Sequence, residues 1–169
     1  DFYNAMDNVG MFWQMPTIQA FHSIVPRSVM DYYDSIDNGR GVGSRPNTDH
    51  YGIRGLLSVK YLFDFSNDDD SFYDNTLKST KMPGFSYYDT QNGFDVYVND
   101  YYIPYGFTYD AFVSMDQYEQ ISKNYREFVM LDALILSNEQ INKYSHLLSY
   151  HGDIDLTDYT QAYYLEMCE

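Results

Sequence analysis

The chain has 169 residues, of which 44% are hydrophobic and 19% are aromatic. A chain of about 150 residues buries roughly 70% of its unfolded surface, so we expect one domain over residues 1–169 and exclude disorder along the whole chain. Ten Lys and Arg stand against 25 Asp and Glu, which gives a net charge of -15. This charge would repel nucleic-acid phosphates and anionic lipids at long range, so we expect no nucleic-acid partner.

The apolar runs are too short to cross a membrane. The most apolar one, Phe128–Leu136, already carries Asp132, whereas a spanning helix needs about 20 apolar residues. Cys168 is the single cysteine, which excludes an intrachain disulfide and a zinc cluster built from thiolates. The chain begins at Asp1 without an initiator Met or a signal segment, and we interpret it as part of a longer polypeptide.

The first third of the chain predicts one strand and one helix before a loop. A short strand is expected around Met11–Met15. Apolar residues then recur at three- and four-residue steps over Arg27–Ile36, which predicts a helix, and Gly39 is suited to a left-handed cap after it. The run Gly39–Asp49 is rich in Gly, Pro and Ser and predicts a loop.

A helix-to-strand step and a hairpin follow. Asp49 can cap a short helix that reaches about Leu57, and an apolar strand is expected over Ser58–Phe65. The acidic run within Ser66–Ser71 predicts a solvated, mobile surface loop. The hairpin is expected from two β-prone segments, because the Asn-Gly pair between them favours a tight turn; these are Phe85–Asp89, Phe94–Asn99 and the turn Thr90–Gly93.

The last third is predicted to be mainly helical. Tyr101–Val113 contains Pro104 and Gly106 and is expected to form a strand with a bulge or at a sheet edge. A helical stretch capped by Ser114 or Asp116 is expected to reach about Leu136, with a break near Asn124. A second helix is expected from Ser137, whose spacing to Gln140 resembles a capping box. A final helix is expected over Thr157–Met167. Together these elements predict an α+β fold, a single domain with a small mixed β-sheet flanked by helices.

Few patterns indicate metal or catalytic chemistry. The four histidines are far apart and are expected to be ordinary surface or core residues. The segment Gly152–Asp158 alternates acidic residues as calcium loops do, but Asp158 replaces the required Gly and Tyr164 replaces the final Glu, which excludes an EF-hand. Adventitious calcium there or at Asp68–Asp70 is the less favoured alternative. Nucleophile and phosphate-loop motifs are absent, so we expect no catalytic residue, metal or cofactor.

Half of the cations lie close together in the sequence. These five are Arg27, Arg40, Arg45, Arg54 and Lys60. They either form structural ion pairs with carboxylates such as Asp34, Asp37 and Asp49, the favoured interpretation, or form a pocket for an anion. The 20 tyrosines and Trp13 could stack on sugar rings, although packing in the core is the favoured interpretation for most of them.

Three segments carry a family resemblance. They are NVGMFWQMPTIQAFHSIVP (Asn8–Pro26), RGLLSVKYL (Arg54–Leu62) and VNDYYIPYGFTYD (Val98–Asp110). In this order they resemble the extracytoplasmic part of YfhO-type bacterial membrane proteins. Such proteins look like GT-C class glycosyltransferases, which move a sugar from a polyprenyl-phosphate carrier onto cell-envelope polymers such as teichoic acids.

The resemblance implies a domain on the extracellular side of the membrane of a Gram-positive bacterium, next to its own transmembrane bundle. The catalytic acidic residue of that class lies near the first membrane helices, so no catalytic residue is transferred to this chain. The expected role is non-catalytic support of a membrane enzyme, with contact to a cell-envelope glycan or a polyprenyl-phosphate sugar. The candidate residues for an anionic acceptor are Trp13, His22, Arg40, Arg45, Arg54 and Lys60. The alternatives are a stand-alone polysaccharide-binding module and a purely structural ectodomain that packs against its membrane bundle.

Overall fold

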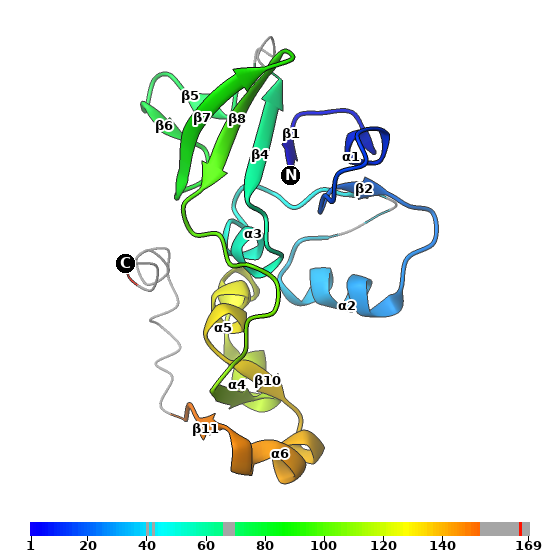
Figure 1. Ribbon diagram of the computed structural model, residues 1–169. Helices are drawn as coiled ribbons and strands as arrows, with labels where there is room; N and C mark the ends of the chain where they lie inside the picture. Colours follow the sequence, from blue (N-terminus) through cyan, green and yellow to red (C-terminus); the bar gives the residue numbers. More distant parts are fainter. Residues whose placement is uncertain (40, 42, 66–69, 153–165, 167–169) are drawn as a thin grey trace. The chain divides into compact units, whose positions relative to one another are not determined.

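The chain divides into two compact units, each with its own sheet (Figure 1). The computed structural model describes residues 1–39, 41, 43–65, 70–152 and 166. Unit 1 comprises residues 1–34 and 38–103, and unit 2 comprises residues 35–37 and 104–169. The α+β class is confirmed, because helices accompany mixed sheet structure. The assignment of both units to a single domain stays a prediction.

Unit 1 is built on a four-stranded mixed sheet. Its strand order is β1 (Phe2–Tyr3), β4 (Tyr61–Phe65), β8 (Phe94–Asn99) and β7 (Phe85–Gln91). The first pair is parallel and the other two are antiparallel, which confirms the expected mixed sheet. The strand predicted from Ser58 is present but starts three residues later, at Tyr61.

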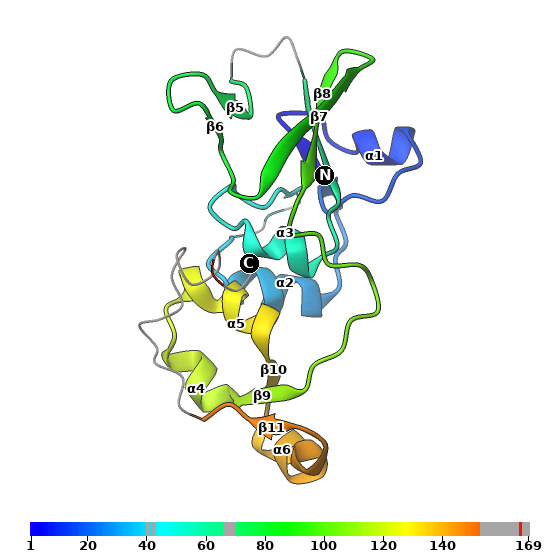
Figure 2. The same cartoon turned by 60° about the vertical axis from the view of Figure 1, so that its left-hand side comes forward.

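The hairpin between β7 and β8 forms as predicted (Figures 1 and 2). Asn92 and Gly93 both adopt positive φ, 52° and 79°, which is the geometry that the Asn-Gly pair favours. A bulge interrupts the ladder between Tyr87 and Asp89. Gly93, the second residue of the tight turn, thus has a backbone conformation that only glycine adopts without strain.

The two faces of this sheet carry different side chains. Buried residues cluster on one face, where Leu62 lies opposite Tyr97 and both pack with Phe72, Met82 and Phe85. The neighbouring strand positions point to the opposite face because side chains alternate along a strand. That second face is aromatic, and its rings belong to Phe2, Phe63, Phe65 and Phe94.

Short elements complete unit 1. The helices are α1 (Val9–Phe12), α2 (Arg27–Ser35) and α3 (Gly52–Leu56), and the short strand pairs are β2 (Ala20–Phe21) with β3 (Gly43–Ser44) and β5 (Tyr73–Asp74) with β6 (Ser79–Thr80). The predicted helix from Arg27 is confirmed as α2. The predicted loop Gly39–Asp49 is confirmed outside β3, over its described residues.

Unit 2 contains a parallel three-stranded sheet that the sequence patterns do not predict. Its central strand β9 (Ala111–Ser114) lies between β10 (Leu134–Leu136) and β11 (Ser149–Tyr150). The helical elements are α4 (Met115–Gln120), the 3₁₀ turn Lys123–Tyr125, α5 (Arg126–Asp132), α6 (Asn138–Tyr144) and the 3₁₀ turn Ser145–Leu147. Ser114 with Gln117 and Ser137 with Gln140 form capping boxes, which confirms both predicted helix starts.

Two predictions in the first 40 residues are wrong. Residues Met11–Met15 do not form a strand, because α1 ends at Phe12 and Gln14 takes a left-handed φ of 55° that interrupts extended backbone. Gly39 is not the left-handed residue after α2. Asp37 takes that role with a φ of 60°, and the Asn38 nitrogen donates to the Tyr33 carbonyl one turn back.

Three later predictions also need correction. Asp49 does not cap α3, because the helix begins at Gly52 and its N-cap is Tyr51. The Asp49 nitrogen donates to the Asn47 side chain in the turn before it. Most of Tyr101–Val113 is irregular, and only its end enters a strand, β9. Gly106, with a φ of 92°, interrupts the extended backbone before it. The helix predicted through Leu136 stops at Asp132, because Leu134–Leu136 pairs with β9.

Two further predictions fall on residues outside the described part. The helix over Thr157–Met167 lies there except for Glu166, and residues 66–69 of the predicted loop Ser66–Ser71 lie there as well. Within residues 1–39, 41, 43–65, 70–152 and 166, no helix combines the length and the hydropathy that crossing a membrane demands.

Candidate functional site

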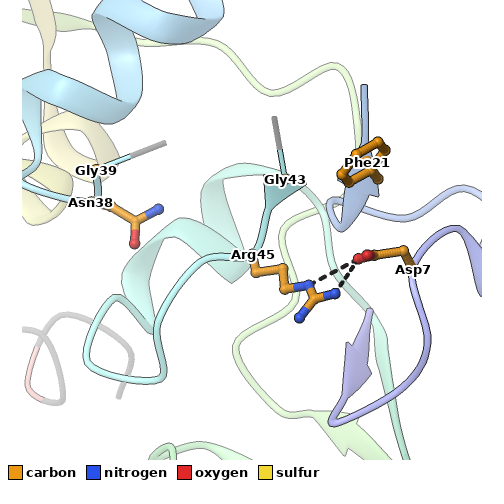
Figure 3. A pocket seen from close by; sticks show the side chains of 6 residues that line it. All are labelled: Asp7, Phe21, Asn38, Gly39, Gly43 and Arg45. Atoms are coloured by element: carbon orange, nitrogen blue, oxygen red, sulfur yellow. Dashed lines mark hydrogen bonds and ion pairs between the residues drawn. The ribbon is translucent and has the colours of Figure 1, made fainter. Parts of the chain in front are cut away.

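A polar cavity of about 350 Å³ lies beside the β2–β3 pair of unit 1 (Figure 3). Its lining combines one aromatic ring, two charged side chains, one amide and glycine backbone, from Asp7, Phe21, Asn38, Gly39, Gly43 and Arg45. We call it the Asp7–Arg45 cavity. Of the five proposed residues that the structure describes, Arg45 lines it.

Local pairing brings these residues together from distant parts of the sequence. Phe21 lies opposite Gly43 in the β2–β3 ladder, so no side chain on the facing position covers its ring. The Asn8 amide clamps the same residue: its Oδ1 accepts from the Phe21 nitrogen at 2.9 Å and its Nδ2 donates to the Phe21 carbonyl at 3.4 Å. This clamp holds Asp7, the residue before Asn8, at the rim of the cavity.

Arg45 and Asp7 form an ion pair across the cavity (Figure 3). Arg45 Nε donates to Asp7 Oδ1 at 3.0 Å, and Arg45 Nη2 donates to the same oxygen. Both side chains are partly exposed to solvent, 58% for Arg45 and 38% for Asp7. The pair leaves Asp7 Oδ2 and one guanidinium nitrogen available for a polar ligand, while the two charges cancel.

The lining has the chemistry of a site for a polyhydroxylated ring. An aromatic ring offers an apolar face to C–H groups, a carboxylate accepts hydrogen bonds from hydroxyls, and guanidinium and amide groups donate them. The volume falls at the lower end of the range for small-molecule sites, about 300 to 1,000 Å³. The cavity therefore fits a short stretch of glycan better than a large apolar ligand.

Arg54 has a structural position. Its side chain is 2% exposed, and it donates to the carbonyls of Pro46 at 2.6 Å, Asn47 at 2.5 Å and His50 at 2.7 Å. Its Nε also lies 3.4 Å from the Asp1 carboxylate. Arg54 thus satisfies the backbone of the loop that follows β3, and its nitrogens are engaged in these structural contacts.

The remaining sequence candidates lie in different surroundings. Trp13 packs against Phe94, with ring centroids 5.0 Å apart, on the aromatic face of the sheet. His22 lines a separate and mainly apolar cavity of about 450 Å³. Lys60 lies over the rings of Tyr61 and Tyr102, and Arg40 falls outside the described residues. Arg45 and Arg54 both line a third cavity, of about 220 Å³, and the structure does not bring the other described candidates to it.

Ion pairs, the favoured interpretation of the clustered cations, are present. Arg45 pairs with Asp7, Arg54 with Asp1 and Arg27 with Asp31. Sequence reasoning missed Asp7, Phe21 and Asn38 as cavity residues. Asp7 and Asn38 stand in no quoted motif, and Phe21 lies in a family segment that does not mark it as a cavity residue. The pairing of β2 with β3 places Phe21 opposite Gly43.

A second polar cluster, centred on Asp70, joins β1 to the end of β6. The Asp70 carboxylate accepts hydrogen bonds from Lys81, from Asn4 at 2.9 Å and from the Tyr3 hydroxyl at 3.0 Å. These hydrogen bonds, that from Lys81 above all, lower the pKa of Asp70 from 3.8 to about 2. With this pKa the Asp70 carboxylate is ionised at every physiological pH. Its hydrogen bonds therefore connect the end of β1 to the residue after β6.

Among the described residues, no three His, Cys, Asp or Glu side chains gather closely enough to hold a metal ion. The Asp7–Arg45 cavity offers hydrogen-bonding groups and one exposed aromatic ring to a ligand.

Comparison with known families identifies the class of protein as a bacterial membrane protein. The profile described as "Bacterial membrane protein YfhO" matches residues 2–163. The chain therefore belongs to the YfhO family, as its sequence motifs predict. No curated protein and no solved structure matches the chain.

Proposed function

We propose that this chain is the non-catalytic extracytoplasmic domain of a YfhO-family glycosyltransferase and that the Asp7–Arg45 cavity contacts the acceptor glycan. The donor would be a polyprenyl-phosphate sugar held by the membrane part, and the acceptor a cell-envelope polymer of the teichoic acid type. The domain's permanent neighbour would be its own transmembrane bundle, on the extracellular side of a Gram-positive membrane. Membership of a membrane protein family supports this arrangement.

One observation carries the proposal: an uncovered aromatic ring lies beside a neutralised ion pair in a cavity of about 350 Å³. Phe21 is 44% exposed, so a sugar can reach its face. The ion pair supplies donors and acceptors that are fixed before the ligand arrives, which lowers the entropic cost of binding.

Charge favours the neutral parts of such a polymer over its phosphates. Asp7 already neutralises Arg45, and the whole chain carries a net charge of -15. A phosphate would have to displace the Asp7 carboxylate and approach against this charge. The sugar units of the acceptor are therefore the part that the cavity is proposed to recognise.

A purely structural ectodomain is the second candidate. Its support is that Arg54 and Trp13 are engaged in packing contacts. A stand-alone polysaccharide-binding module is the third, and it would use the same cavity.

Calorimetric titration of the 169-residue chain separates glycan binding at this cavity from a purely structural role. Neutral oligosaccharides and glycerol-phosphate oligomers are added separately to the native chain, to Arg45→Met and to Arg27→Met. Arg27 is the matched control, because its exposed guanidinium pairs with Asp31 on α2 and does not line the cavity. We expect saturable binding of the neutral glycan, weakened roughly tenfold by Arg45→Met and unchanged by Arg27→Met.

Other outcomes assign the function differently. Absence of binding to both ligands by the folded native chain would support the structural ectodomain. Binding of the glycerol-phosphate oligomer alone would contradict the preference for neutral sugars. Sugar transfer by the purified chain would contradict the non-catalytic role.

A further inference from the structure

An uncharged segment stands out in this acidic chain. Residues Asn8–Pro26 contain no Asp, Glu, Lys or Arg, although the chain has 25 acidic and 10 basic residues. The same segment exposes large apolar side chains, namely Met11, Phe12, Trp13, Phe21 and Ile24. Large exposed apolar side chains that recur within one short segment are typical of an interaction surface.

Hydrogen bonds close most of this segment into a loop of fixed shape. The Asn8 side chain binds the Phe21 backbone through both its oxygen and its nitrogen, so Asn8–Phe21 forms a closed surface loop, here called the apolar loop. Inside it, the Met15 nitrogen donates to the Gly10 carbonyl at 2.8 Å. A Cβ on Gly10 would lie 2.5 Å from Thr17 Cγ2, so the loop closes tightly on that glycine.

Trp13 fastens the apolar loop to the aromatic face of the sheet. Its ring lies 5.8 Å from Phe2 and 5.0 Å from Phe94, edge to face in both cases. Figures 1 and 2 both show α1 at the outer margin of unit 1, beyond β1. The two residues before Trp13 are left in solvent: Met11 is 65% exposed and Phe12 is 79% exposed.

We propose that the apolar loop docks onto the interfacial layer of a lipid bilayer. Phe, Trp, Met and Ile side chains bury apolar area at that layer, and Trp is favoured there because its ring is amphipathic. The absence of acidic residues from the loop removes, at this one surface, the local repulsion that a net charge of -15 creates elsewhere. The family of the chain places a bilayer within reach.

The shape of the surface argues for a bilayer over a protein groove or a glycan. Met11 and Phe12 protrude and do not line any of the cavities described above. Phe65 is 43% exposed, its ring centroid lies 5.4 Å from that of Phe94, and it does not line the Asp7–Arg45 cavity. The inference rests on family membership and does not depend on glycan binding.

A few apolar side chains give weak and reversible membrane binding. Such binding is sufficient for a domain that membrane segments of the same protein already hold near the surface, because the tether raises the effective concentration. The docked loop would fix the orientation of unit 1 relative to the bilayer.

Trp13, the single tryptophan, reports directly on this contact. Its fluorescence is recorded as the chain is titrated with vesicles of phosphatidylcholine, with and without brominated acyl chains. We expect a blue shift of the emission and quenching by the brominated lipid. In Met11→Ser plus Phe12→Ser, the lipid concentration at half-effect should rise roughly tenfold or more.

The matched control is Leu77→Ser plus Leu147→Ser, which removes two exposed apolar side chains outside the loop and should leave the titration unchanged. Circular dichroism verifies that each variant is folded. Vesicles with added phosphatidylglycerol should bind more weakly at low salt, because of the net negative charge. Unchanged Trp13 emission and quenching with phosphatidylcholine vesicles would overturn the proposal, and so would an equal loss of binding in the control. Concentration-dependent self-association in sedimentation, lost in the Met11→Ser plus Phe12→Ser variant while vesicles bind neither protein, would overturn it in favour of a second copy of the chain.

Discussion

Arg54 is charged yet almost fully buried, and its guanidinium holds a loop that has little secondary structure of its own. Three carbonyl groups, of Pro46, Asn47 and His50, accept hydrogen bonds from it. A buried carbonyl without a donor costs about 1 to 3 kcal/mol, so the loop depends on this one side chain. The planar guanidinium reaches several carbonyls at once, which a lysine ammonium cannot do with the same geometry.

Replacing Arg54 by Met should lower the free energy of unfolding by about 3 kcal/mol or more, because the carbonyls and the Asp1 carboxylate lose their partner. Arg54→Lys should recover only part of this loss. Urea denaturation followed by circular dichroism measures both changes. The surface control Arg27→Met should stay within about 0.5 kcal/mol of the native chain. Equal stability of Arg54→Met and Arg27→Met would show that Arg54 is not the residue that holds the loop.

The sequence predicts the presence of ion pairs for the clustered cations but not their partners. Arg45 and Arg54 find carboxylates at Asp7 and Asp1, which are 38 and 53 positions away in the chain. Contacts of this range depend on how strands pair. Sequence proximity therefore does not identify Asp7 and Asp1 as the partners.

Among helices and strands, local sequence patterns predict turns and helix starts correctly, but they do not predict which distant segments pair as strands. The Asn92-Gly93 turn and the capping box at Ser137 involve residues within four positions and form as predicted. Ser114, one of two predicted caps, also caps its helix. Leu134–Leu136 continues an apolar helical pattern, yet it forms a strand because it pairs with β9. The strand β2, which exposes Phe21 in the cavity, is two residues long and leaves no periodicity to read.

The hairpin turn gives a clean test at this scale. Gly93→Ala should destabilise the chain by about 1 to 2 kcal/mol, because Gly93 has a φ of 79° that a residue with a Cβ adopts only with strain. The nearest atom to the added Cβ would be Phe65 Cε2 at 3.9 Å, so the effect is of the backbone alone. Urea denaturation measures the change.

Gly39→Ala is the matched control for this substitution. Its backbone does not have positive φ and no atom lies within 4 Å of the added Cβ, so the change should be neutral or stabilise by about 0.5 kcal/mol. If both alanine variants lost the same free energy, the strain assigned to the turn would be refuted.

For the whole molecule, composition and motifs predict the α+β class and the family. They do not predict the division into two units or the parallel sheet of unit 2. Parallel strands need long connections, and β9 meets β11 only after about 35 intervening residues, so neither shows a local signature. The Asp7–Arg45 cavity cannot be predicted from the sequence either, because its residues come from four separate segments.

The central proposal is that this chain works on the outer side of the membrane, where the proposed glycan acceptor would lie. It is tested by labelling Leu77→Cys in a cysteine-free background of the natural gene product, in intact cells, with a membrane-impermeant maleimide. Leu77 is 74% exposed and lies between β5 and β6, away from the cavity and the apolar loop. The account predicts full labelling without permeabilisation of the cells. Labelling that occurs only after permeabilisation would contradict it.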